Sequence, residues 1–348
     1  MTPATRYGKP AADILAESRA LLRENAEHLA RQRRLADLLS GRGAPRERCA
    51  CCNARLDGAG PFQRRGIDYL LCPECGHVQT RLAPPADQPV DFGAVYPPLS
   101  GAEFASRVER IYRPKLDWAL EALAATDGPP PLERRWLEFG CGYGFFLAAL
   151  RDAGARRFMG LDACRELVER ANTALGENRA ALVDGGLARA VRDSEAEVYA
   201  AFFVLEHLAD LPDFLAAVAE KPEGVAFVFS VPVFGLATVL EDCSDRHFAR
   251  NLDGWTHAQM FTERSLGRFL ELAKCEQVAQ WVFGQDVLDL GRMCALAAEN
   301  YPPALRREVD GALARMADAA QQAVDRAHFS DARHIVAVRR GAPLDAGR

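Results

Sequence analysis

The chain has 348 residues, of which 49% are hydrophobic and 26% are charged, and its formal net charge at pH 7 is −5. This composition predicts a folded globular protein of about two domains and excludes a disordered chain. The acidic balance, with no long lysine or arginine run, makes nucleic acid an unlikely partner; no segment is predicted to enter a membrane, and the absence of an apolar leader favours the cytoplasm.

The first predicted domain is a helical segment, residues 1–44. Apolar residues recur at helical spacing between about positions 11 and 39, with arginine and glutamate between them, so an amphipathic helix or a pair of helices is expected there. This segment carries a basic cluster formed by Arg31, Arg33 and Arg34. The cluster could contact a partner or a polyanion, but a solvated helix face is the simpler interpretation.

Residues 45–85 are predicted to form a zinc ribbon. Two Cys-x-x-Cys pairs, separated by 19 residues, are formed by Cys49, Cys52, Cys72 and Cys75. Each pair can direct two thiolates at one ion, and four thiolates complete the tetrahedron that Zn²⁺ accepts at a structural site. Because no coordination position stays open, the ion is expected to support folding and to take no part in chemistry.

Two alternatives to this ligand set remain open. Cys51 or His77 could replace one of the four cysteines, since both lie beside a Cys-x-x-Cys pair. The two pairs could also be redox-active, although two such pairs at ribbon spacing are more typical of a metal site.

Residues 86–131 are predicted to be a linker rich in proline, followed by helices that cover the next domain. Helical pattern extends from residue 104 to 125, with an interruption near Pro114. Between linker and helix, Phe92 and Tyr96 could form part of a lid over a ligand, or could simply pack a turn.

The strongest signal is a glycine-rich turn in the last predicted domain, residues 132–342. An apolar strand begins at Trp136, carries Glu138, and opens into Gly140, Gly142 and Gly144 before an apolar helix. Such glycines allow a sharp turn and close approach of the backbone to a ligand, and a buried acid beside them suits a cationic group. The spacing differs from the phosphate-binding Gly-x-x-x-x-Gly-Lys-Ser/Thr loop.

Further strands and helices follow in alternation, which predicts a parallel sheet with helices on both faces. One strand ends in Asp162, where a ribose diol would lie at the switch point of a doubly wound sheet, and the next ends in Asp184. Later strands are expected near residues 198–203, 224–232, 277–283 and 332–339, and helices near 262–273, 287–298 and 303–328. The fold class is therefore α/β, Rossmann-like, with seven strands.

With Leu205-Glu206-His207-Leu208 after the fourth strand, the region from about residue 134 to 340 resembles the class I S-adenosylmethionine-dependent methyltransferases. A nicotinamide- or flavin-binding domain is the main alternative, but position 145, where its third glycine would be expected, is Phe. The resemblance implies that the last strand inserts antiparallel beside the fifth. It also implies a cofactor site in which Glu138, Gly140, Cys141, Gly142 and Gly144 hold the methionine part, Asp162 and Ala163 the ribose, Asp184 and Gly185 the adenine, and Phe203 lines the pocket.

Two histidines are candidates for the general base that removes a proton from the methyl acceptor. His207 follows the fourth strand and His257 the fifth, and the carboxyl ends of such strands form the ligand-binding face. Either histidine could instead anchor its loop through hydrogen bonds. Phe203 occupies the position of the additional acid that a metal site beside Glu206 would want, so a catalytic metal is not predicted.

The acceptor is predicted to be a hydroxyl of a sugar, glycan or other small molecule, as in polysaccharide biosynthesis. A cysteine ribbon before such a domain is similar to sugar and surface-glycan methyltransferases and to zinc-finger ribosomal-RNA methyltransferases. The acidic charge and the absence of an Asn/Asp-Pro-Pro-aromatic motif after the fourth strand disfavour RNA. The methyltransferases that act on a sugar carbon carry a further C-terminal domain, whereas this sequence ends soon after its last predicted strand. This difference favours a hydroxyl over a carbon as the methyl acceptor. A protein-directed enzyme that docks through its N-terminal helix or ribbon is a third possibility.

Overall fold

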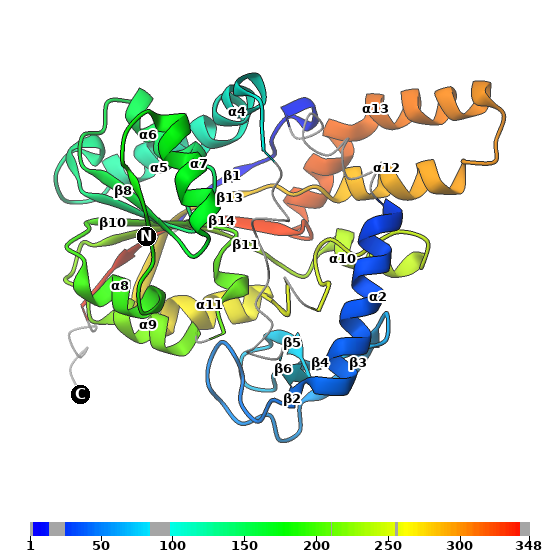
Figure 1. The fold of residues 1–348 in the computed structure, drawn as a ribbon, viewed down its shortest axis with the longest axis horizontal. Helices are drawn as coiled ribbons and strands as arrows, with labels where there is room; N and C mark the ends of the chain where they lie inside the picture. Colours follow the sequence, from blue (N-terminus) through cyan, green and yellow to red (C-terminus); the bar gives the residue numbers. More distant parts are fainter. Residues whose placement is uncertain (1–2, 14–24, 84–97, 210, 255–256, 342–348) are drawn as a thin grey trace.

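The computed structural model describes residues 3–13, 25–83, 98–209, 211–254 and 257–341. Its centre is a mostly parallel sheet of eight strands, flanked by helices on both faces (Figure 1). In sheet order the strands are β1 (Ala4–Tyr7), β13 (Cys275–Val282), β14 (Ala332–Arg339), β11 (Ala226–Pro232), β10 (Val198–Phe202), β7 (Trp136–Phe139), β8 (Phe158–Asp162) and β9 (Ala180–Leu182). The predicted α/β methyltransferase-type fold is confirmed, including the antiparallel pairing of β14 with β11.

Helices bury the two faces of this sheet in separate apolar clusters. One face is covered by α5 (Arg113–Ala124), α6 (Phe145–Asp152) and α7 (Arg165–Leu175), which contribute buried side chains such as Leu116 and Phe146. The other face is covered by α8 (Gly186–Asp193), α9 (Leu211–Ala219) and α11 (Glu263–Leu272), with Phe214 and Phe269 among its buried residues. Central strands buried on both faces explain why their sequences are continuous apolar runs.

The covering helix between linker and sheet is interrupted where the sequence places Pro114. It runs as α4 (Gly101–Arg107), a π-helical turn (Val108–Tyr112) and α5, which carries the proline in its first turn. Pro114 has no N–H to donate to the carbonyl of Arg110, four residues earlier. Instead, Nζ of the buried Lys9 donates to that carbonyl, so the N-terminal segment satisfies the acceptor that the proline leaves open.

The strand β1 is an eighth strand that the helical prediction for residues 1–44 did not include. It pairs in parallel with β13 at one edge of the sheet, and Nε1 of Trp281 donates to the carbonyl of Gly8 at 2.8 Å. Arg6 lies over the same indole ring, 4.0 Å from its centroid. Within the helical prediction, the described residues form α2 (Asn25–Arg42), while residues 14–24 lie outside the described residues.

A second, smaller sheet contains the cysteine loops. Its order is β12 (Gln259–Met260), β5 (Val78–Thr80), β4 (Ile67–Leu71) and β3 (Gly60–Arg64), beside a short pair β2 (Ala44–Pro45) and β6 (Leu82–Ala83). Strand β12 comes from the chain after β11, so the ribbon and the large domain share this sheet. The remaining helices are α10 (Leu236–Leu240) and the pair α12 (Asp286–Ala297) and α13 (Pro303–Arg326), which extends away from the sheet in Figure 1.

Candidate active site and metal centre

The glycine turn after β7 lies where the sequence predicted it. Gly140, Gly142 and Gly144 all have positive φ angles, of 62°, 52° and 80°. A Cβ on Gly140 would overlap Cγ2 of Val204, which follows β10, so the turn passes close against the next strand's loop. The turn therefore needs both the left-handed backbone and the missing side chain at this position.

Glu138 is a buried acid at the end of β7. It is 3% exposed, and its Oε2 has no hydrogen-bond partner among the described residues. Burial is the main reason that the pKa of Glu138 is raised well above its ordinary value; the charge of Asp162 raises it further, and Lys115 opposes the shift. A cation bound beside Glu138 would satisfy the open oxygen and favour the ionised form.

Asp162 supports the glycine turn from the neighbouring strand. Its Oδ2 accepts from the N–H of Gly142 at 2.8 Å, and its Oδ1 accepts from the N–H of Cys164 at 2.9 Å. Each carboxylate oxygen keeps a second lone pair, so the side chain can still accept from a ligand hydroxyl. The structure thus gives Asp162 a role in shaping the turn that the sequence prediction did not include.

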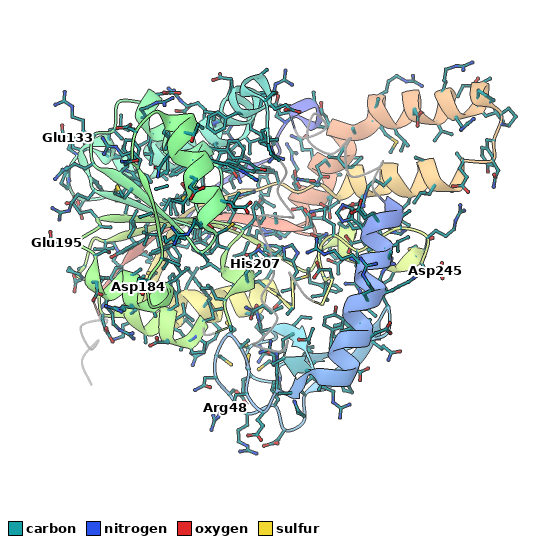
Figure 2. The ribbon with its side chains drawn as sticks, in the orientation of Figure 1. Arg48, Glu133, Asp184, Glu195, His207 and Asp245 are labelled. Carbon is teal, nitrogen blue, oxygen red and sulfur yellow. The ribbon has the colours of Figure 1, made fainter. Side chains whose placement is uncertain are left out.

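The other predicted cofactor residues surround this turn at different depths. Cys141 is buried and packs against Gly160 of β8, whereas Ala163 is exposed. Asp184 is exposed beyond β9, the last strand of the sheet, with Oδ2 3.6 Å from Nη1 of Arg189 (Figure 2). Gly185 follows with a φ of 71° and caps α8. Asp184 and Gly185 therefore lie at the outer edge of the sheet.

Phe203 lies at the inner end of the site, directly after β10. Its φ is 57°, its N–H donates to the carbonyl of Ser230 at 2.9 Å, and its side chain is 38% exposed. Nζ of Lys115 lies 4.9 Å from the centroid of the Phe203 ring. Lys115 is itself 3% exposed, so a buried amine lies at the aromatic ring and its charge also acts on Glu138.

Aromatic side chains from the covering helix close over the start of α6. Phe104 of α4 and Tyr112 of the π-helical turn lie with their ring centroids 5.0 Å and 5.2 Å from that of Phe145. These residues and Lys115 were not identified from sequence. No local motif marks them, because their position over the turn depends on how the covering helix packs.

His207 and His257 come together, although they lie on different loops. Their rings stack with centroids 5.1 Å apart, and Nε2 of His257 lies 3.9 Å from Oε1 of Glu206. The backbone N–H of His257 donates to Oδ1 of Asp253 at 2.9 Å, and its Nδ1 lies 3.0 Å from the carbonyl oxygen of Arg250. The sequence named the histidines separately as candidates, and their contact is a finding of the structure.

Glu206 is the buried member of this group. It is 1% exposed, and neither carboxylate oxygen has a hydrogen-bond partner among the described residues. Burial raises the pKa of Glu206 to about 8, and burial is also the main reason that the pKa of His257 is lowered. Both shifts favour the neutral forms, so a protonated Glu206 would lie beside a neutral His257 near neutral pH.

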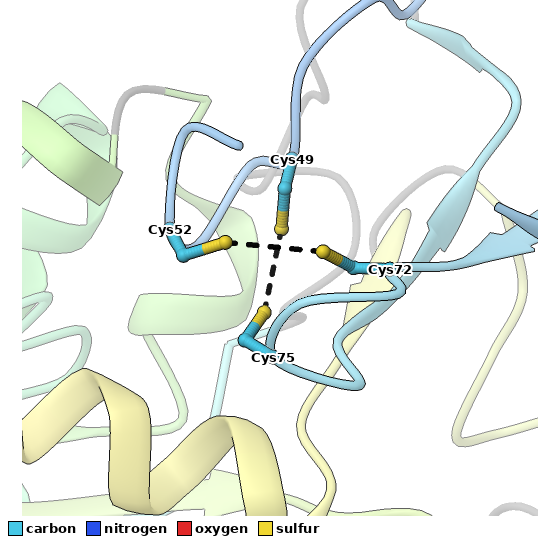
Figure 3. Close-up of side chains that lie close together, drawn as sticks. All are labelled: Cys49, Cys52, Cys72 and Cys75. Carbon is cyan, nitrogen blue, oxygen red and sulfur yellow. Dashed lines mark hydrogen bonds between the residues drawn. The ribbon is translucent and has the colours of Figure 1, made fainter. Parts of the chain in front are cut away.

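The four predicted zinc cysteines converge on one point from two loops (Figure 3). The Sγ atoms of Cys49 and Cys75 are 3.6 Å apart, and those of Cys52 and Cys72 are 3.8 Å apart. Four thiolates at the usual Zn–S distance of about 2.3 Å would be about 3.8 Å from one another, so the observed separations fit a zinc ion.

Both cysteine loops have the same local geometry. The residues after the second cysteines, Asn53 and Gly76, have φ angles of 59° and 71°. The N–H of Asn53 donates to the carbonyl of Cys49, and that of Gly76 to the carbonyl of Cys72, each at 2.9 Å. Repetition of one turn in two loops is typical of zinc knuckles.

Cys51 and His77, the two alternative ligands, lie outside the four-sulfur group. Sγ of Cys51 contacts the carbonyl of Ser265 at 3.9 Å. His77 is fully buried, with Nε2 3.1 Å from Oε1 of Gln259 and Nδ1 3.4 Å from Oγ of Ser265. Both residues join the ribbon to the large domain.

Gln259 extends this connection to the candidate active site. While its Oε1 faces His77, its Nε2 donates to the carbonyl of Leu208 at 2.7 Å, next to His207. Gln259 is 3% exposed and belongs to β12, two residues after His257. The ribbon therefore contacts the segments that carry both histidines through one buried amide.

Some sequence expectations fall outside the described residues. Phe92 and Tyr96, considered for a lid, belong to the segment 84–97, and Trp255 beside His257 is also not described. None of the helices in the described part of the chain has the length and apolar character needed to cross a lipid bilayer.

Comparison with known protein families gives a match that covers just over half of the chain. A family model for a methyltransferase domain matches residues 104–280, which include the glycine turn and both histidines and exclude the ribbon. No curated protein sequence matches. The family assignment rests on this model alone, because the solved structures that follow are too distant to support an argument.

Two of these structures illustrate the distance. Magnesium protoporphyrin IX methyltransferase from Synechocystis PCC 6803, solved with bound S-adenosylhomocysteine, has a TM-score of 0.43 and 15% identity over 72% of this chain and 93% of that chain. Geranyl diphosphate C-methyltransferase from Streptomyces coelicolor A3(2) has a TM-score of 0.40 and 11% identity over 72% of this chain and 89% of that chain.

Proposed function

Because the chain belongs to the methyltransferase-domain family and is an S-adenosylmethionine-dependent methyltransferase, we propose that it methylates a hydroxyl group of a sugar, a glycan or another small polar molecule. The observation that carries the proposal is the group of Glu206, His207 and His257 after β10 and β11, which can take a proton from such a hydroxyl. The remaining support comes from the cofactor turn, a cavity with charged side chains in its lining and the net charge of the chain.

The residues at the glycine turn fit the proposed cofactor. Oε2 of Glu138 is buried without a partner among the described residues and would accept from the positively charged amino group of S-adenosylmethionine. Gly140 and Gly142 would let the backbone approach its methionine part. Asp162 has lone pairs for the ribose hydroxyls, while Ala163, Asp184 and Gly185 would border the adenosine from the surface side.

The cofactor, when bound, supplies a methyl group that is already activated by the positive sulfur. The protein must therefore orient the acceptor and remove its proton. A carbonyl oxygen only accepts, so the contact between Nδ1 of His257 and Arg250 assigns the ring proton to Nδ1. The lone pair of Nε2 then points toward Glu206 and is available for the hydroxyl proton, with His207 stacked behind it.

A cavity lined in part by Asp253, which accepts from the N–H of His257, contains charged groups that suit a hydroxyl-rich acceptor. Its volume is about 220 Å³, and it lies between α2, the ribbon and the loop that leads to His257. Apolar and charged side chains both line it: the apolar part is formed by Leu29, Ile67, Leu252 and the ring of Tyr69, and the charged residues are Arg33, Arg64, Arg65, Asp245 and Asp253. Such mixed donors and acceptors suit sugar hydroxyls better than a purely apolar substrate.

The ribbon is proposed to hold a structural Zn²⁺ through Cys49, Cys52, Cys72 and Cys75. The two short Sγ separations support this assignment. All ten cysteines are free, which is consistent with the proposed cytoplasmic location, where thiols stay reduced. The net charge of −5 supports a small acceptor over a nucleic acid.

Calorimetry with S-adenosylmethionine and S-adenosylhomocysteine tests the cofactor site. We expect both to bind the zinc-loaded protein, and Glu138→Gln to weaken S-adenosylmethionine binding at least tenfold. Glu166→Gln, a change on the exposed first turn of α7, is the matched control and should bind like the wild type. Equal affinity of all three proteins would contradict the role of Glu138.

Acceptor class is tested with radiolabelled methyl donor and a panel of nucleotide sugars, glycans, RNA and protein extracts. We expect label in the sugar or glycan fraction, as a methyl ether that survives mild base. Label in RNA or protein instead would overturn the proposed acceptor while leaving the cofactor assignment intact.

A further inference from the structure

A second group of metal-binding side chains lies at the candidate active site, apart from the four cysteines. One ligand atom from each of Glu206, His207 and His257 lies within 4.8 Å of the other two. At the usual metal–ligand distance of about 2.1 Å, two ligands of one ion are about 3 Å apart when adjacent and about 4.2 Å apart when opposite. The 3.9 Å separation of Nε2 of His257 and Oε1 of Glu206 falls in this interval, and small side-chain rotations would bring in His207.

The tautomer of His257 leaves two acceptors facing each other. Its Nδ1–H donates to the carbonyl of Arg250, so the ring nitrogen that faces Glu206 carries a lone pair. A backbone carbonyl in this position is also the usual partner that orients a metal-binding imidazole. A carboxylate and an imidazole lone pair at this distance need a proton or a cation between them.

Glu206 adds the second observation. The Glu206 side chain has no exposed surface, and neither of its carboxylate oxygens accepts a hydrogen bond from the described residues. A buried carboxylate without donors is costly unless it is neutralised or binds a cation. Both unpartnered oxygens belong to the carboxylate that lies close to the two histidines.

We propose that Glu206, His207 and His257 bind a divalent metal ion with a preference for nitrogen and oxygen ligands, such as Mn²⁺ or Zn²⁺, and that this ion holds the acceptor hydroxyl. Two imidazoles and one carboxylate leave coordination positions open, unlike the four thiolates of the ribbon. The proposed role of the ion rests on the proposed hydroxyl acceptor. The binding of the ion does not depend on that proposal.

The ion would change how the hydroxyl loses its proton. Coordination lowers the pKa of a bound hydroxyl, so the proton leaves to water and the oxygen keeps its electron pair for the methyl carbon. The metal keeps its oxidation state. With the ion bound, Nε2 of His257 acts as a ligand and no longer as the base. In the sequence, Phe203 stands where a metal site beside Glu206 would want an additional acid, so no catalytic metal is predicted. In the structure, His257 comes from a distant part of the chain and supplies a ligand in place of that acid.

Binding is tested by titrating Mn²⁺ into the protein whose ribbon is filled with one equivalent of zinc, with S-adenosylhomocysteine present. Calorimetry and the loss of the free-Mn²⁺ electron paramagnetic resonance signal should both report one bound equivalent. Glu206→Gln and His257→Ala should each weaken Mn²⁺ binding at least tenfold. Glu220→Gln, at an exposed position after α9, should leave it unchanged.

Zinc content and S-adenosylhomocysteine binding show that each variant is folded. If the folded wild type takes up no Mn²⁺, or if Glu206→Gln binds Mn²⁺ as tightly as Glu220→Gln, the metal site is wrong. Methyl transfer to a hydroxyl that is unaffected by Mn²⁺ would overturn the metal role and preserve the proposed function. Specific Mn²⁺ binding without transfer to any hydroxyl would do the reverse.

Discussion

Gly140 shows how strongly a single residue can determine the cofactor turn. Its backbone is left-handed, with a φ of 62°, and a Cβ would overlap the side chain of Val204. Gly142 has a similar φ of 52°, yet a Cβ there would meet no atom within 4 Å. The two positions therefore separate the effect of backbone strain from the effect of contact.

We expect Gly140→Ala to weaken S-adenosylmethionine binding by more than tenfold and to lower stability by roughly 2–4 kcal/mol, since strain and overlap add. Gly142→Ala should cost only about 1–2 kcal/mol from strain. Calorimetry and thermal unfolding of both variants measure the difference. Equal losses would mean that Val204 can move aside without consequence.

Asp325 is a buried acid whose charge the fold satisfies only in part. Its Oδ1 accepts from Nε2 of Gln321 at 2.9 Å, and its Oδ2 has no hydrogen-bond partner among the described residues. Burial is the main reason that the pKa of Asp325 is raised to about 6; Asp331 adds to the shift and Arg333 opposes it. The folded state therefore holds this proton more tightly than the unfolded state does.

Stability should consequently fall as pH rises from about 4 to about 6, through the interval between the unfolded and folded pKa values. Asp325→Asn should remove this contribution and gain on the order of 1–3 kcal/mol at pH 8. Urea unfolding at pH 5 and pH 8 measures it. Asp310→Asn, on an exposed position of the same helix, is the control, and a parallel pH profile for both variants would contradict the assignment.

Among the elements outside the large sheet, the ribbon contacts the segments that carry His207 and His257. His77 and Gln259 join the cysteine loops to the segment beside His207, and Thr262 at the start of α11 donates to the carbonyl of Gly76 at 3.0 Å. Loss of the ion would loosen these contacts, because the loops that carry them are held by the four sulfurs.

Cys72→Ser should therefore abolish zinc binding and reduce methyl transfer at least tenfold, while S-adenosylmethionine binding at the glycine turn changes little. Hydrogen exchange should increase in β5 and β12. Cys243→Ser, at an exposed cysteine, should alter none of these measurements. A zinc-free variant with full transfer activity would show that the ribbon does not support the active site.

Sequence pattern predicted those elements whose signal is local. The long apolar strands, the capped helix that starts after Thr262 and the cysteine loops are determined by residues close together in the chain. Strands β1 and β12 have four and two residues, and neither carries a period that marks it as a strand. Their pairing is decided by partners far away in sequence, β13 and β5.

The same distinction applies to the site. The glycine turn and the four cysteines could be named in advance, because each is marked by residues close together in the sequence: the glycines follow an apolar strand that carries Glu138, and the cysteines form two Cys-x-x-Cys pairs. The stacking of His207 on His257 and the approach of Lys115 to the ring of Phe203 could not, since both follow from tertiary packing. Asp162 was named for the ribose, and only the structure shows its two hydrogen bonds to the backbone.

At the scale of the whole molecule, the N-terminal segment ties the sheet to its covering helix. Residues 3–9 cover the edge of β13, stack on Trp281 and reach the carbonyl of Arg110 through Lys9. Deletion of residues 1–9 should remove several hydrogen bonds and destabilise the protein by roughly 2–4 kcal/mol. The fluorescence of the tryptophans should shift to the red as Trp281 becomes exposed.

Lys9→Ala is the narrower variant for this prediction, because it keeps β1 and removes the contacts of one side chain, with the carbonyl of Arg110 and with the rings of Trp281 and Phe283. It should lower the melting temperature by less than the deletion does and shift the tryptophan fluorescence by less, because β1 still covers Trp281. Should the deletion unfold at the wild-type temperature, β1 would be dispensable for the sheet.

Strand β12 belongs to the large domain by sequence and to the ribbon by its pairing. The ribbon and the large domain are therefore not two separate domains joined only by a linker. A ribbon acquired by gene fusion could be lost again, or exchanged between enzymes, without disturbing its neighbour. Here such an exchange would have to replace β12 and the residues around His257 at the same time, so the ribbon and the active-site loop are expected to be inherited, and to diversify, together.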